Sequence, residues 1–164
     1  MHLDQLDLAL LTALHDHPRS GPLELSRLTK VARATVQSRI QRLENAGVIT
    51  GYGPDIDLEA AAHPLTAFVT LEIAQGALEE VASELAAIPT ILEAYMTTGS
   101  ADVLCKVAAA DHADLQDTLL ELNHSASVVR STSVVVLGTV VPPRVLPLLE
   151  RSAATRASRA PAHR

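Results

Sequence analysis

A short polar segment between two apolar runs contains residue types that could hold a small molecule. Residues 96–107 read MTTGSADVLCKV, with a single glycine and a single acid. Hydroxyl and carboxylate groups beside a glycine can hydrogen-bond a small polar ligand, but a plain hairpin turn has the same composition. The position of the segment along the chain leaves both interpretations open.

A second set of polar side chains falls on one face of a predicted helix over residues 32–47. Val36, Ile40 and Leu43 form its apolar stripe. Glutamine pairs naturally with adenine and arginine with guanine, while other polar groups reach phosphates. The candidate DNA contacts are Arg33, Thr35, Gln37, Ser38, Arg39, Gln41 and Arg42. Any amphipathic surface helix has such a polar face. The helices that precede it are therefore needed to distinguish a DNA-reading helix from an ordinary surface helix.

Those preceding helices favour DNA binding. Leucines at helical spacing predict a helix over residues 3–15, and Pro22 suits the first turn of a second, short helix. A four-residue turn at 29–32 joins this short helix to the polar one, which Gly47 ends. Three helices with a tight turn between the last two predict a helix-turn-helix domain over residues 1–50.

The charge is unevenly distributed along the chain. The net charge is −6, but five of the six basic residues in 1–50 fall between 27 and 42, whereas residues 51–150 hold three basic and fourteen acidic residues. A small basic patch joined to an acidic remainder is typical of a DNA-binding part attached to a part with another task.

The remainder of the chain has a different period. Strands are predicted at 64–74, 91–98, 101–110 and 127–141, and amphipathic helices at 76–88 and 111–124. The fold class is therefore α+β, with a ferredoxin-like βαββαβ domain over residues 64–141. We expect a partner subunit to cover the sheet face that carries no helices. Residues 51–63 are predicted as a hairpin-like linker, and 142–164 as a C-terminal extension whose tail, 151–164, is disordered.

Several other classes of function lack support. No apolar run has membrane-spanning length, so we expect a cytoplasmic protein with no membrane partner. Cys105 is the only cysteine and reads as a core residue. His15 and His17 lie two apart on a helix and point to different faces, so no metal site is predicted. No catalytic residues are predicted, because no motif assembles a nucleophile, a base and an oxyanion donor.

The residues also resemble a known family. The segments 6–28, 35–52 and 98–107 are similar to the Lrp/AsnC family, the feast/famine transcriptional regulators, and the likeness covers about residues 3–141. The resemblance implies dimers that assemble into octamers and an effector, usually an amino acid, that binds between dimers near the glycine loop. The implied effector contacts are Met96, Thr97, Thr98, Gly99, Ser100, Asp102 and Leu104, with Ser131, Thr132 and Ser133 as weaker candidates for an opposing wall.

Two positions depart from the family pattern. Ala32 occupies the N-cap of the polar helix where serine is common, which removes a contribution of about 1 kcal/mol unless another group caps the helix. Ser100 stands where an acid is frequent. Asp102 would either hold the amino group of the ligand or brace the loop.

The sequence therefore predicts a transcription regulator that binds double-stranded DNA, has no cofactor and responds to an amino-acid effector. The alternative is an oligomeric amino-acid-binding module that no longer reads DNA. The acidic sheet domain and the missing serine cap are the two observations that keep this alternative open.

Overall fold

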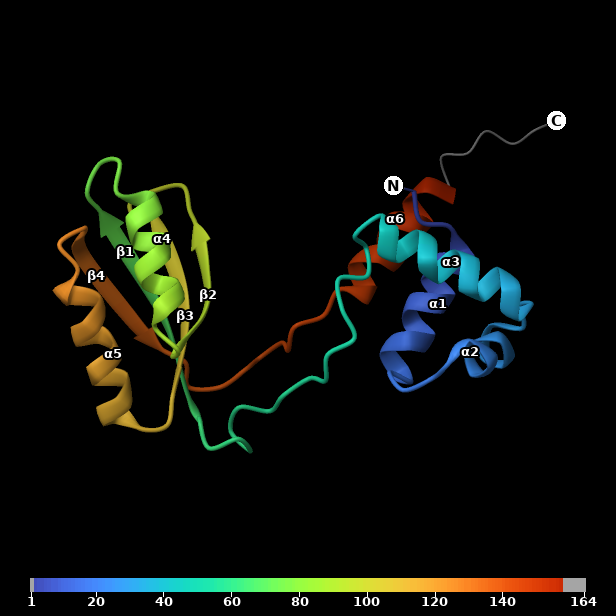
Figure 1. Ribbon diagram of the computed structural model, residues 1–164, viewed down its shortest axis with the longest axis horizontal. Coiled ribbons are helices and arrows are strands. Elements are labelled where there is room, and N and C mark those ends of the chain that lie inside the picture. The colour runs from blue at the N-terminus through green and yellow to red at the C-terminus, as the bar shows by residue number, and fades with distance from the viewer. Residues whose placement is uncertain (1, 158–164) are drawn as a thin grey trace. The chain divides into compact units, whose positions relative to one another are not determined.

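The computed structural model describes residues 2–157, which divide into two compact units (Figure 1). The helical unit comprises residues 2–55 together with 141–157, and the sheet unit comprises residues 56–140. No helix in the described range 2–157 combines the length and the apolar character needed to cross a membrane.

The helical unit begins with three helices, as the sequence predicts. They are α1 (Gln5–Asp16), α2 (Pro22–Thr29) and α3 (Arg33–Asn45). Leu10, Leu25 and Val36, one from each helix, are fully or almost fully buried together and form its core. Apolar spacing on each helix therefore fixes how the three pack.

The helix ends follow local chemistry. Pro22 occupies the first turn of α2, and Gly47 stops α3 with φ +67°, a left-handed conformation that suits glycine. At the start of α3, Ala32 makes no side-chain cap hydrogen bond. An alanine methyl group cannot accept a hydrogen bond, so the stabilisation that a serine would give at this position is absent, as the sequence predicts.

The sheet unit has the predicted βαββαβ order. Its elements are β1 (Leu65–Ile73), α4 (Leu78–Ala87), β2 (Ile91–Met96), β3 (Val103–Ala109), α5 (His112–His124) and β4 (Val128–Val135). The four strands are antiparallel to their neighbours in the order β2-β3-β1-β4. This is the ferredoxin-like arrangement, in which both helices cover one face of the sheet (Figure 1).

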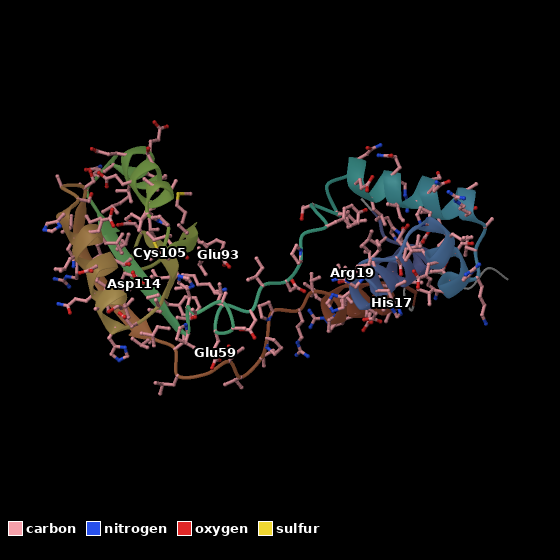
Figure 2. All side chains as sticks on the ribbon, turned by 60° about the horizontal axis from the view of Figure 1, so that its bottom comes forward. His17, Arg19, Glu59, Glu93, Cys105 and Asp114 are labelled. Carbon is pink, nitrogen blue, oxygen red and sulfur yellow. The ribbon has the colours of Figure 1, made fainter. Side chains whose placement is uncertain are left out.

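The core of the sheet unit lies between the sheet and its two helices. Val69 and Leu71 of β1 are fully buried there, with Val81 of α4 and Leu122 of α5 packed over them. Cys105 of β3 belongs to the same cluster (Figure 2), and its burial raises the pKa of the thiol to about 11. The interpretation of this cysteine as a core residue is confirmed.

The opposite face of the sheet, called the open face below, carries no helix. Phe68, Tyr95 and Val134 point to this side and are 41%, 53% and 64% exposed. Alternation along each strand places them opposite the core residues. The open face therefore presents large apolar side chains to solvent.

Two segments differ from the prediction. Residues 51–57 contribute no strand, so the expected hairpin is not formed; instead the Asp57 carboxylate accepts the backbone N–H groups of Glu59 and Ala60 and starts a short turn. Helix α6 (Leu146–Ala157) reaches into the stretch predicted to be disordered. The rest of that predicted tail, 158–164, lies outside the described residues.

Candidate functional site

The outward surface of α3 holds most of the predicted DNA contacts. This surface faces away from Val36 and Leu43, which are fully buried. The predicted contacts that are exposed on α3 with no ion pair among the described residues are Arg33, Thr35, Gln37, Ser38 and Gln41. The Gln41 amide also donates to the Asn45 side-chain oxygen at 3.1 Å. These side chains form one solvated hydrogen-bonding surface, called the α3 face below.

Arg39 and Arg42 have a different role. The Arg42 guanidinium lies 2.5 Å from one carboxylate oxygen of Asp7, and Arg39 lies 3.2 Å from the other. Arg39 also forms an ion pair with Asp4. The side chain of Asp7 is fully buried, while those of Arg39 and Arg42 keep 29% and 46% exposure. Both guanidinium groups therefore pair with acids at the start of α1 and remain partly accessible to solvent.

The two acids also build the start of α1. The Asp4 carboxylate accepts the backbone N–H of Asp7 at 2.9 Å, and the Asp7 carboxylate accepts that of Asp4 at 2.9 Å. The pKa of Asp4 is lowered, first by the backbone hydrogen bond from Asp7 and then by Arg39, while the Asp4 hydrogen bond raises the pKa of Arg39. Asp4 and Asp7 thus cap α1 and tie it to α3 with the same carboxylates.

This arrangement gives two predicted DNA-contact residues an additional role inside the helical unit, while their contacts with DNA stay a prediction. The helical wheel places Arg42 on the polar face, for a base contact, and Arg39 where a phosphate contact is plausible. Wheel position alone does not reveal that Asp4 and Asp7 reach them from another helix. The i, i+3 spacing of these acids was a visible signal of a capping box, but the sequence does not indicate its partners on α3.

The second candidate site is the loop between β2 and β3, residues 97–102, called the glycine loop below. The Thr97 backbone N–H donates to the Asp102 carbonyl at 2.9 Å, and the Thr97 hydroxyl donates to the Ala101 carbonyl at 2.7 Å. Gly99 has φ +120°, a conformation in which any side chain would be strained. The loop therefore keeps its shape through its own hydrogen bonds and one glycine.

Asp102 fixes the glycine loop to the sheet. Its backbone N–H donates to the Leu71 carbonyl, and its carboxylate accepts the Ile73 N–H, each at 2.9 Å. Of the two roles considered for Asp102, this geometry corresponds to bracing the loop. Within residues 2–157, the hydroxyls of Thr98 and Ser100 make no hydrogen bond and are exposed, so they remain available to a ligand.

The other predicted effector residues are not gathered around the glycine loop within one chain. The register places Met96, Val103, Leu71 and Ser131 in one row across the sheet, so β4 lies two strand spacings, about 10 Å, from β3. Ser131 donates to the Asn123 side-chain oxygen of α5 at 2.7 Å.

Strand alternation also places the predicted effector residues on both faces of the sheet. Leu104 and Thr132 belong to the open face. The face that carries the helices holds Met96, Ser131 and Ser133. One small ligand bound to a single chain could not contact all of these residues.

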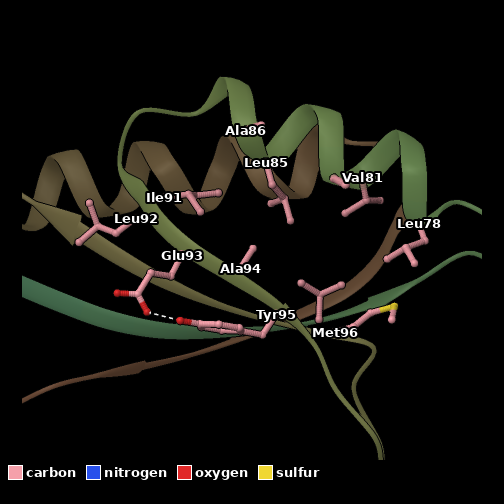
Figure 3. A pocket seen from close by; sticks show the side chains of 12 residues that line it. Leu78, Val81, Leu85, Ala86, Ile91, Leu92, Glu93, Ala94, Tyr95 and Met96 are labelled. Atoms are coloured by element: carbon pink, nitrogen blue, oxygen red, sulfur yellow. Dashed lines mark hydrogen bonds between the residues drawn. The ribbon is translucent and has the colours of Figure 1, made fainter. Parts of the chain in front are cut away.

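An apolar groove begins beside the glycine loop. It has a volume of about 470 Å³ and runs between α4 and the edge strand β2 (Figure 3). Leu78, Val81 and Leu85 line it from the helix, and Ile91 and Met96 from the strand. Only Met96 of these was predicted from the sequence. The volume is in the range of small-molecule pockets, and its walls would suit an apolar group.

Comparison with known proteins identifies both units. A family model for a winged helix-turn-helix DNA-binding domain matches residues 3–50, and one for the Lrp/AsnC ligand binding domain matches residues 66–146. The HTH-type transcriptional regulator FL11 of Pyrococcus horikoshii is 31% identical over 137 residues, which cover 84% of this chain and 91% of that protein. The regulator AldR of Mycolicibacterium smegmatis is 32% identical over 133 residues, covering 79% and 78%.

Solved structures agree with these sequence matches. Escherichia coli AsnC superposes with a TM-score of 0.84 at 23% identity, covering 90% of this chain and all of that chain, which supports the fold. A transcriptional regulator of Neisseria meningitidis, in complex with L-Met, superposes with a TM-score of 0.80 at 25% identity, covering 86% and 94%. With a helix-turn-helix unit and a ligand-binding sheet unit in this order, the chain belongs to the Lrp/AsnC family of DNA-binding transcriptional regulators and is not an enzyme.

Proposed function

We propose that the α3 face reads duplex DNA and that the sheet unit binds an amino acid at the glycine loop. The DNA-reading role is carried by the five exposed polar side chains of the α3 face. Gln41 and Ser38 stand at its centre for contacts to base edges, and Arg33 lies at its end for a phosphate. Selection of duplexes from fragmented genomic DNA tests this role, and failure to retain any duplex would refute it.

The effector proposal combines the glycine loop with the neighbouring groove. Thr98 and Ser100 offer free hydroxyls, which suit the polar ends of an amino acid. The groove that starts at Met96 is mostly apolar, which suits an aliphatic or thioether side chain. The L-Met complex of the Neisseria meningitidis protein supports this class of effector. Because β4 lies far from the loop, we assign the opposing wall to a second copy of the chain.

Replacing Gly99 by leucine is expected to abolish effector binding while the protein stays folded. A side chain at φ +120° costs roughly 1–3 kcal/mol in this loop conformation, so the loop takes another shape. A thermal-shift screen with the twenty amino acids measures this, because a ligand stabilises the form that binds it. Gly138→Leu is the matched control, since Gly138 is not in the left-handed region. A ligand that stabilises wild type and Gly99→Leu equally would remove the glycine loop from the site.

We further propose that a second copy covers the open face and forms a dimer, which would be the building block of a larger assembly. Phe68 and Val134 supply its apolar centre. The charges on this face are paired: Lys106 lies 3.2 Å from Glu93. The pKa of Glu93 is lowered, chiefly by the Tyr95 hydroxyl and then by Lys106. Paired charges are less costly to cover than isolated ones.

Phe68→Glu is expected to convert the protein to monomers. It places an unpaired carboxylate at the centre of the proposed interface, where burial of a charge is strongly unfavourable. Sedimentation equilibrium measures the change in mass. Leu120→Glu on α5, a leucine that is 48% exposed and outside the open face, is the control and should keep the wild-type mass. An unchanged mass for Phe68→Glu would place the interface elsewhere.

A further inference from the structure

The C-terminal helix α6 belongs to the helical unit although it follows the sheet unit in the chain. Among the helices and strands, it packs chiefly against α1. Leu146, Leu149 and Ala153 recur at helical spacing and are partly buried, whereas Leu148 and Glu150 are exposed. The helix is thus amphipathic, with one side turned to the unit that contains α3. Residues 147–157 lie beyond both stretches matched by the family models.

The surface that receives α6 is formed by two segments. Leu11 and Leu14 come from α1, and residues 48–55 follow α3. Val145, Leu146 and Leu149 meet these segments around a shared hollow of about 450 Å³.

The segment after α3 is itself attached to that helix, because the Tyr52 hydroxyl donates to the Glu44 carboxylate at 2.6 Å. None of the α3 face residues lines this hollow, so α6 leaves the DNA-reading surface uncovered.

The position of α6 gives the sheet unit two covalent connections to the helical unit. The chain passes from the helical unit to the sheet unit after residue 55 and returns at residue 141. Strand β4 continues into the return segment, where the Val136 N–H still donates to the Thr66 carbonyl of β1 at 2.8 Å. Pro142 and Pro143 then precede α6, and consecutive prolines make a connector stiff.

We propose that α6 is a docking helix of the same chain, through which the sheet unit holds α1 at a second point. By packing on α1, it stabilises the helix whose acids Asp4 and Asp7 position α3. Only the predicted effect on DNA affinity rests on the proposed DNA-reading function. The packing of α6 on α1 is a property of the protein without DNA.

Leu149→Glu, made in the full chain, tests the docking against Leu148→Glu. Leu149 is partly buried on the inner side of α6, whereas Leu148 is 52% exposed on the same helix. Both variants carry the same new charge. Hydrogen exchange measured by mass spectrometry should show about tenfold faster exchange of the α1 amides in Leu149→Glu and wild-type exchange in Leu148→Glu.

The same two variants are then titrated with the duplex retained by wild type. Leu149→Glu should bind roughly three- to tenfold more weakly, because α1 opens more often. Equal α1 exchange in both variants would overturn the docking. Wild-type α1 exchange that slows with rising protein concentration would also overturn it, because α6 would then come from another copy. If wild type retains no duplex, the proposed function fails, while the exchange experiment still decides the docking.

Discussion

Asp7→Ala is expected to lower the free energy of unfolding of the helical unit by about 3 kcal/mol, the lower end of the cost of breaking a buried ion pair. The Asp7 carboxylate is fully buried and accepts Arg39, Arg42 and the backbone N–H of Asp4. Its removal leaves two guanidinium groups without this acceptor. The lower end of the range applies because both remain partly in water.

Urea unfolding followed by circular dichroism measures the Asp7 effect. Asp16→Ala, at the exposed other end of α1, is the control and should unfold close to wild type. A loss for Asp7→Ala no larger than that of the control would show that the ion pairs do not hold α1 and α3 together.

The ion pairs also have a consequence at low pH. The pKa of Asp4 is lowered in the folded protein, so its contribution to stability is present above the ordinary value of 3.8 and is lost as pH falls through the folded value. The connection between α1 and α3 should therefore weaken in acid and persist at neutral pH.

The second large effect is expected on DNA affinity. Gln41→Ala should weaken operator binding about tenfold or more, because a well-placed glutamine contact to a base is worth roughly 1–3 kcal/mol of discrimination. The loss should depend on the base sequence, and the fold should be intact since Gln41 is exposed. Fluorescence anisotropy with the selected duplex and with a scrambled one measures it. A variant that loses equal affinity for both duplexes would not support base reading by Gln41.

Periodicity was sufficient to predict the architecture. The three helices, the stop at Gly47 and the βαββαβ order follow from apolar spacing, because each element has one buried face. The same reasoning did not predict the second half of α6, because residues 151–157 are small, polar and basic and have no apolar period. The apolar anchors Leu146 and Leu149 precede them, and docking on α1 supports the helix to Ala157.

The site residues could be predicted only in part, for physical reasons. The exposed set on the α3 face follows from the helical wheel, but the ion pairs of Arg39 and Arg42 depend on contacts with residues more than thirty positions away. In the sheet, Ser131 and Thr132 are adjacent in sequence yet lie on opposite faces, because successive strand side chains alternate. The hydroxyl-rich segment 131–133 therefore cannot present all its hydroxyls on one wall of an effector site, although its sequence suggested that it could.

The salt dependence of DNA binding by wild type and Arg33→Ala tests the central claim, that the α3 face contacts duplex DNA, most directly. If Arg33 neutralises one phosphate, the slope of log K against log salt should fall in magnitude by about 0.9 in the variant. Arg144→Ala, an exposed arginine outside α3, should keep the wild-type slope. An Arg33→Ala protein with the same slope and affinity as wild type would contradict the assignment of the α3 face to DNA.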